Sequence, residues 1–248
     1  MSATLRATWL ARTDYLDAWR LQEAVATRVR SGGPERLLLL EHDPVYTIGR
    51  RGTIDHLLVA PEVLRRRGIS VYRVDRGGDI TYHGPGQLVG YPITRLGEGG
   101  DLVAYVRALE LGLCDALATY GIVGHSEAGK TGVWVDLPDG RPAKIAAIGV
   151  RVSRGVTTHG FALNVSTDLE GFDRMLPCGF AHEVASLARL GVIARVSEVA
   201  ERSAVAIASR LRHELLFEAR IDPPDETEIP TDAPVRNAAD LLAEEVPA

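Results

Sequence analysis

The chain has 248 residues, of which 46% are hydrophobic and 25% are charged, so it can bury the core of a sizeable globular domain. Its 28 basic and 33 acidic side chains give a formal net charge of −5, which argues against a nucleic-acid-binding surface built on a basic excess. The sequence shows no apolar run as long as a membrane span, no signal-peptide pattern and no disulfide framework, so we expect a cytoplasmic protein.

Hydrophobic periodicity predicts mixed secondary structure in the first half of the chain. The predicted strands cover 5–10, 36–41, 69–74, 80–82 and 88–94, and the predicted helices cover 14–29, 61–67 and 101–120. A glycine-rich stretch, 76–87, lies between the third and fifth of these strands and includes the fourth; it has four glycines and a proline. Glycines allow a backbone to approach a ligand closely, so this stretch is a candidate binding loop.

The second half predicts hairpins, with strands at 131–136, 143–152 and 157–165, a helical segment at 168–175, and a last helix from a Ser197 cap to about 216. From 221 onward, prolines and acids predict a disordered tail over 221–248. We therefore predict an α+β fold, with a mixed, largely antiparallel sheet packed with helices, in one domain over 1–220. No GxGxxG sequence supports a dinucleotide-binding fold.

Lys144 is unusual for its position in the predicted strand at 143–152. Strand alternation places it on one face with Ala146, Ile148, Val150 and Val152, which are apolar. A buried ammonium needs a partner or a site, although a lysine near the start of a strand can also extend to solvent. The sequence pattern alone favours neither a buried lysine that serves a site nor a lysine that extends to solvent.

Cys178 lies between Pro177 and Gly179, a setting that can present a thiol at a bend. A lone cysteine is most often a small buried hydrophobe, and Cys114, inside a predicted helix, is read as structural. A lysine beside a thiol raises its thiolate fraction, so Cys178 and Lys144 are a candidate nucleophile and charge partner.

Other residues leave alternatives open. Arg76 is either a charge anchor or a structural pair, and His83 and His159 are acid–base candidates or satisfied structural histidines. A Cys178–His159–Asn164 hydrolase is weakened because His159 and Asn164 fall on opposite faces of a regular strand. The chain has no Walker phosphate loop, no Gly-x-Ser-x-Gly elbow and no zinc-ligand spacing.

Several motifs, taken in order, resemble the lipoyl(octanoyl) transferase family. They are Glu41 to Gly49 (EHDPVYTIG), Arg76 to Gln87 (RGGDITYHGPGQ), Lys144 to Val150 (KIAAIGV), Thr158 to Asn164 (THGFALN) and Pro177 to Gly179 (PCG). The resemblance covers roughly residues 5–216, and several ordered motifs are far more specific than one glycine loop. It implies the catalytic-domain fold of the biotin and lipoate protein ligases.

The resemblance also implies a function, transfer of an octanoyl or lipoyl group from acyl carrier protein to a lysine of a lipoyl domain. Its acceptors are expected to be the lipoyl domains of 2-oxoacid dehydrogenase complexes and the glycine cleavage H protein. Cys178 would be the acyl-thioester nucleophile and Lys144 the residue that lowers its pKa. The residues implied to line the acyl pocket are Arg76, Gly77, Gly78, Asp79, Ile80, Thr81, Tyr82, His83, Ala147, Ile148, Gly149, His159, Gly160, Phe161 and Ala162.

The transfer needs no ATP, cofactor or metal, and we expect a monomer that binds neither membrane nor nucleic acid. Two competing interpretations are an ATP-dependent lipoate-protein ligase on the same fold and a non-catalytic binder of lipoyl domains or carrier protein. A requirement for ATP would distinguish the ligase from a transferase. Reaction of Cys178 with iodoacetamide near neutral pH would distinguish a transferase from the binder, in which a buried thiol should resist.

Overall fold

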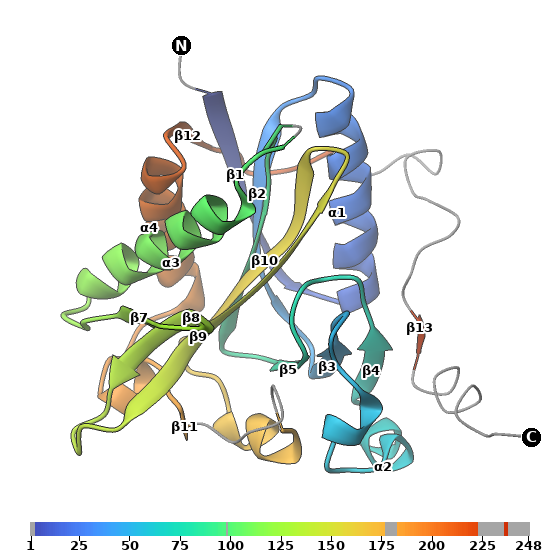
Figure 1. The fold of residues 1–248 in the computed structure, drawn as a ribbon, viewed down its shortest axis with the longest axis vertical. Helices are drawn as coiled ribbons and strands as arrows, with labels where there is room; N and C mark the ends of the chain where they lie inside the picture. Colours follow the sequence, from blue (N-terminus) through green and yellow to red (C-terminus); the bar gives the residue numbers. More distant parts are fainter. Residues whose placement is uncertain (1–2, 98, 177–182, 223–235, 238–248) are drawn as a thin grey trace, which may run out of the picture.

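The computed structural model describes residues 3–97, 99–176, 183–222 and 236–237 (Figure 1). Across its larger sheet the strands follow in the order β12 (His213–Phe217), β1 (Ala3–Thr13), β2 (Glu35–His42), β6 (Gln87–Ile93), β10 (Val156–Asn164), β9 (Pro142–Ser153), β8 (Lys130–Asp136) and β7 (His125–Glu127), and β11 (Glu183–Val184) pairs with β9. β1 runs parallel to β2 and β12, and β11 runs parallel to β9, whereas the other neighbours are antiparallel. The predicted mixed, largely antiparallel α+β fold is therefore confirmed.

Helices cover both faces of the larger sheet, as Figure 1 shows. α3 (Leu102–Ala118) and α4 (Val196–Arg210) pack on one face, and α1 (Tyr15–Arg30) packs on the other. Because it lies between these layers, β10 is buried along its whole length. Asp14 and Asp101 begin α1 and α3, since each carboxylate accepts backbone N–H groups of the first turn. None of the helices described here is both long and apolar enough to cross a bilayer.

A smaller sheet has the order β13 (Arg236–Asn237), β4 (Ser70–Arg73), β3 (Val45–Ile48) and β5 (Ile80–His83). It packs with α2 (Pro61–Arg66) and the short 3₁₀ helices η1 (Ile54–His56) and η2 (Leu169–Arg174) around a second apolar cluster. Most of the tail, 223–235 and 238–248, lies outside the described residues, so its disorder stays a prediction.

The smaller sheet's layer holds the segment that leads towards Cys178. Leu58 N donates to Arg174 O at 2.9 Å, and Leu176 N donates to His56 O at 2.8 Å. Met175 is buried in the same apolar cluster. The described chain just before residue 177 is thus fixed by both backbone hydrogen bonds and apolar packing.

The last predicted helix differs from the structure at both ends. α4 begins at Val196, so Ser197 lies within its first turn and is not the cap. The helix ends at Arg210, Arg212 takes a left-handed backbone with φ of 60°, and residues 213–217 form β12 beside β1. Leu215, which falls inside the helix predicted to run to about 216, is a strand residue because pairing with β1 satisfies the backbone there.

His213 and Glu35 join β12 to the rest of the sheet through a contact of 2.5 Å between His213 Nε2 and Glu35 Oε2. The hydrogen bond to Glu35 raises the pKa of His213 above its ordinary value. The stabilisation from this pair is therefore complete below the unfolded pKa of histidine and is lost as pH rises through the folded pKa. We expect His213→Ala to lower the melting temperature more at pH 6 than at pH 8.5, as measured by circular dichroism. An equal loss at both pH values would contradict this coupling.

Candidate active site

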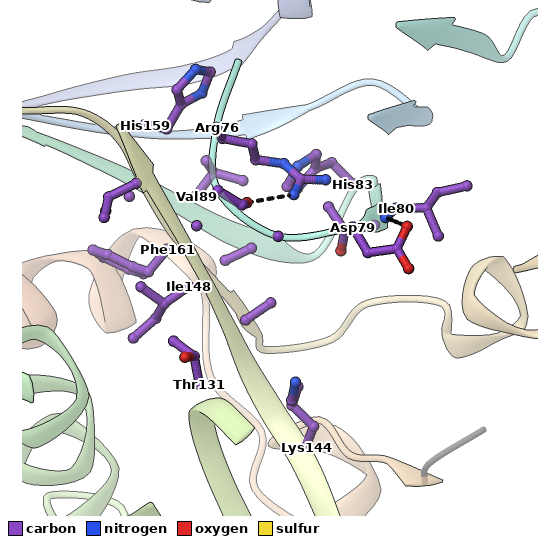
Figure 2. A pocket seen from close by; sticks show the side chains of 18 of the residues that line it. Arg76, Asp79, Ile80, His83, Val89, Thr131, Lys144, Ile148, His159 and Phe161 are labelled. Carbon is purple, nitrogen blue, oxygen red and sulfur yellow. Dashed lines mark hydrogen bonds between the residues drawn. The ribbon is translucent and has the colours of Figure 1, made fainter. Parts of the chain in front are cut away.

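A cavity of about 610 Å³ opens between the larger sheet and the loop that follows β4. Its walls come from β5, β6, β8, β9 and β10, together with η1 and η2 and their neighbours. Figure 2 shows Lys144 and His159 at opposite ends of this view, with Ile148 and Phe161 between them. Its volume and its mixture of apolar walls with a few polar groups are typical of a small-molecule site.

The glycine-rich loop lies directly on β9. Gly77 N donates to Val150 O at 3.0 Å, which pins the loop to the strand. A Cβ at Gly149 would lie only 2.8 Å from Gly77 O, so a side chain there would displace the loop. The close approach at this position is therefore between the loop and β9, and the predicted approach of the loop to a ligand stays a prediction.

Arg76 anchors the start of that loop. It is buried, and its guanidinium donates to Thr47 O at 2.7 Å and to Gly77 O at 3.0 Å. Asp79 is buried at the other end of the loop, where Asp79 Oδ1 accepts from Ile80 N at 2.7 Å. Asp79 Oδ2 lies 2.7 Å from His56 Nδ1. Both charged side chains line the cavity, and each also braces the loop's own backbone.

Lys144 reaches the cavity because β9 contains a β-bulge. Trp134 pairs with Lys144 but Val133 pairs with Ala146, so Ile145 is the extra residue. Ile145 and Ala146 consequently both pack into the core beneath α3 and α4. The predicted shared face of Lys144 with Ala146 and Ile148 is therefore wrong, since the bulge reverses the alternation between them.

The bulge leaves the ammonium of Lys144 beside an aromatic ring and the cavity. Lys144 Nζ lies 4.8 Å from the ring centroid of Trp134, a cation–π contact. Val184 pairs with Lys144, and Ala185 N donates to Lys144 O at 2.9 Å. Lys144 is half-buried, which favours the first of its two sequence interpretations, a lysine that serves a site.

Cys178 lies outside the described residues. The described residues on either side of that gap, Met175 and Val184, both line the cavity. Val184 is also the strand partner of Lys144. The two ends of the segment that carries Cys178 are therefore attached to the wall of the cavity that contains Lys144.

The cavity carries an excess of positive charge. Its described lining includes the cations Arg51, Arg76, Lys130 and Lys144, against the carboxylate of Asp79. Four positive charges and one negative charge favour anions such as a thiolate or an oxyanion. They also disfavour an ammonium group that enters the cavity.

His159 occupies the far end of the cavity in a left-handed backbone conformation with φ of 58°. Its N–H donates to Gln22 Oε1 at 2.8 Å, and its Nε2 lies 2.8 Å from Asp75 Oδ1. Burial alone would raise the pKa of Asp75, but contacts with His159 and Arg151 hold it below its usual range. These contacts, together with the ion pair between Arg151 and Asp75, hold the strained residue at that end of the cavity.

The structure brings most of the expected acyl-pocket residues together. Those that line the cavity are Arg76, Gly77, Gly78, Asp79, Ile80, Thr81, His83, Ala147, Ile148, Gly149, His159, Gly160, Phe161 and Ala162, and Lys144 joins them. Tyr82 is placed elsewhere, since its ring packs on Tyr46 and Phe172 in the smaller sheet's core. Thr81 and His83 alternate with Tyr82 on β5, which explains the difference.

Sequence reasoning missed several residues of this wall. Tyr15, His56, Tyr91 and Trp134 all line the cavity, yet their spacing in the chain indicates ordinary core or turn positions. Two further lining residues, Gln87 and Asn164, did carry a signal in the sequence, since each is the polar last residue of a motif. The two residues pair with each other where β6 and β10 border the cavity.

Comparisons with known proteins identify the family of this chain. Residues 14–208 match the family model "Lipoyl protein ligase A/B catalytic domain". The chain is 51% identical over 195 residues to an octanoyltransferase of Solibacter usitatus, covering 78% of this chain and 86% of that protein. It is 49% identical over 204 residues to an octanoyltransferase of Chloroflexus aurantiacus, covering 80% of this chain and 90% of that protein.

Solved structures show the same fold at low sequence identity. A lipoate-protein ligase A bound with ATP matches with a TM-score of 0.68 and 20% identity, covering 92% of this chain and 91% of that one. A bipartite lipoate protein ligase from Thermoplasma acidophilum, studied with its E2 lipoyl domain, matches with a TM-score of 0.68 and 18% identity, covering 92% and 89%. With about half of its aligned residues identical to the two octanoyltransferases and the family model spanning most of its length, the chain belongs to the octanoyltransferase family of the lipoyl protein ligase A/B catalytic domain.

Proposed function

We propose that this acyltransferase moves an octanoyl group from acyl carrier protein to a lysine of a lipoyl domain through a thioester on Cys178. One observation carries the proposal: an apolar cavity has Lys144 in its wall, and both described flanks of the Cys178 segment are attached to that same wall. Consecutive Cα atoms are about 3.8 Å apart. Cys178 follows Leu176 by two residues, so their Cα atoms can be at most about 7.6 Å apart. We propose that the thiol acts at this cavity.

In the first half of the reaction, the Cys178 thiolate attacks the carbonyl carbon of the octanoyl thioester. Lys144 and the cavity's excess positive charge favour the thiolate over the thiol. The same charge stabilises the oxyanion of the tetrahedral intermediate. The carbon–sulfur bond to the carrier then breaks, the electron pair leaves on the carrier sulfur, and the octanoyl group remains on Cys178.

In the second half, the neutral amine of the acceptor lysine attacks the acyl-Cys178 carbonyl. A carbon–nitrogen bond forms, and the electron pair of the broken carbon–sulfur bond returns to Cys178. Once Cys178 is acylated, Lys144 has no thiolate to hold its charge and releases its proton to solvent. Its neutral amine then accepts the proton that the nitrogen of the acceptor lysine loses. Thioester to amide is downhill, so no ATP is required.

The octanoyl chain lies along β9 and β10. Gly149 and Ala147 of β9 pair with Gly160 and Ala162 of β10 in the sheet register. All four residues line the cavity, and backbone oxygens lie close to both Gly149 and Gly160. Ile148 and Phe161 contribute larger apolar side chains to the lining, and the acyl chain packs against this apolar part of the wall.

The expected acceptors are the lipoyl domains of 2-oxoacid dehydrogenase complexes and the glycine cleavage H protein, with octanoyl-acyl carrier protein as donor. A thiol nucleophile suits the reducing cytoplasm. We assign the catalytic domain to residues 1–220 and the acidic tail to 221–248, and we expect a monomer.

The test is octanoylation of an apo lipoyl domain with two sets of donors. Octanoyl-acyl carrier protein without ATP should give full transfer, and free octanoate with ATP should give none. The reverse result would establish an ATP-dependent ligase, and no transfer with either set would leave a non-catalytic binder. Mass spectrometry of the lipoyl domain reads all three outcomes.

A further inference from the structure

His83 is a buried histidine in the cavity wall, held on both sides by aromatic rings. Its ring stacks on Tyr15 at a centroid distance of 6.2 Å and meets the edge of His42 at 5.8 Å. His83 Nδ1 lies 2.7 Å from Gln87 Oε1. These contacts fix the plane of the imidazole, so the position of its proton decides what it presents to the cavity.

A chain of hydrogen bonds determines that position. Asn164 Nδ2 donates to the backbone Ala185 O at 3.0 Å, so Asn164 Oδ1 faces Gln87 as an acceptor. Gln87 Nε2 donates to Asn164 Oδ1 at 2.9 Å and to the backbone Tyr82 O at 3.2 Å. The remaining amide atom, Gln87 Oε1, can only accept, and the proton it accepts must be carried by His83 Nδ1.

The other ring nitrogen is then an acceptor. Burial, with a further contribution from His42, lowers the pKa of His83 to about 3, so the ring is neutral and carries one proton. With that proton on Nδ1, Nε2 keeps a lone pair. Among the described residues His83 Nε2 has no hydrogen-bond partner, and His83 lines the cavity. Nε2 is therefore the ring atom available to a ligand.

The hydrogen-bond chain that starts at His83 reaches the backbone of Lys144. Gln87 of β6 pairs with Asn164 of β10, and the next residue of β10, Leu163, pairs with Ala146 of β9. Ala185, which accepts from Asn164, also donates its N–H to Lys144 O. The hydrogen-bond chain and Lys144 are thus joined through one backbone segment, 184–185.

We propose that Gln87 and Asn164 are positioning residues that hold His83 in its Nδ1–H form, so that His83 Nε2 accepts a hydrogen bond from the amine of the acceptor lysine. The inference rests on the proposed function and names the group that receives the second substrate. The positive cavity disfavours an ammonium, so the amine enters neutral. One N–H then donates to Nε2, which leaves the nitrogen lone pair free to attack the acyl group.

The tautomer can be measured directly on the wild-type protein by ¹⁵N NMR of its histidines, with His83→Gln used to assign the signal. We expect His83 to show a protonated Nδ1 and a bare Nε2 at neutral pH. In Gln87→Leu the Nδ1 proton loses its acceptor, so a mixture of the two neutral forms should appear. A wild-type His83 protonated on Nε2, or one carrying both protons, would overturn the proposal even if the variant failed to fold.

The kinetic test separates the two halves of the reaction. Enzyme is first loaded with octanoyl-acyl carrier protein, and apo lipoyl domain is then added. Gln87→Leu should slow release of the octanoyl group to the lipoyl domain about 10-fold or more, while loading stays within about 3-fold of wild type. The matched control is Gln22→Leu, which removes another buried amide, one that accepts from His159 N, without touching His83.

The outcomes distinguish the inference from the proposed function. If wild type forms no octanoyl-enzyme, the proposed function fails. If it forms but Gln87→Leu passes the group on at the wild-type rate, or slows loading and release equally, the positioning role fails and Gln87 is merely structural. Gln22→Leu is expected to show no selective loss of release, so a selective loss in that variant too would also overturn the role.

Discussion

Replacing Cys178 with alanine is expected to abolish octanoyl transfer, with a loss of at least about 1,000-fold. The proposed mechanism passes the octanoyl group through the sulfur of Cys178, and alanine offers no nucleophile in its place. The measurement is octanoylation of an apo lipoyl domain from octanoyl-acyl carrier protein, followed by mass spectrometry. A Cys178→Ala enzyme that retained a tenth of the wild-type rate would show that the lysine attacks the carrier thioester directly.

Cys114 supplies the matched control for this experiment. It is half-buried within α3, and burial raises the pKa of its thiol to about 11. Cys114→Ser should therefore keep the wild-type transfer rate. The same difference predicts that iodoacetamide at neutral pH labels Cys178 and leaves Cys114 unmodified.

Two replacements of Lys144 test its two proposed roles separately, as the charge partner of the Cys178 thiolate and as the acceptor of the amine proton. Lys144→Met removes the cation, so the Cys178 thiol should return towards the pKa of a free cysteine, about 8.5, and its thiolate fraction at pH 7 should fall roughly 30-fold. Alkylation of Cys178 by iodoacetamide, measured against pH, should show a midpoint displaced upward. An unchanged midpoint would remove Lys144 as the charge partner.

Lys144→Arg keeps a cation beside Trp134 but removes a usable base, since a guanidinium stays protonated. Alkylation should therefore remain close to wild type, while the octanoyl-enzyme accumulates because the acceptor amine has lost its proton acceptor. Quenched-flow mass spectrometry follows both species. Full transfer by Lys144→Arg would show that the proton leaves by another route.

Local signals in the sequence were strong enough to predict most elements of the fold. The capped helices at Asp14 and Asp101 and the hairpin strands at 131–136 and 143–152 lie close to their observed bounds. The exception is the chain after Arg210. An apolar spacing that also fits a helix forms β12, because the exposed edge of β1 offers backbone partners that no local pattern reveals.

The candidate site was predictable at the level of motifs and not of geometry. The glycine-rich loop and the strands β9 and β10 meet at one cavity, as their unusual composition suggested. The direction of Lys144 was not predictable, since the bulge at Ile145 depends on pairing with Val133 and Trp134. Nor was the proton position on His83, because it depends on Gln87 and Asn164, both of which lie on other strands.

The most direct test of the account is the mass of the intact enzyme after mixing with octanoyl-acyl carrier protein without ATP. We predict one octanoyl adduct, mapped by peptide analysis to Cys178, that disappears when an apo lipoyl domain is added. An enzyme that octanoylates the lipoyl domain while never carrying an adduct, or that carries it on another residue, would contradict the Cys178 thioester.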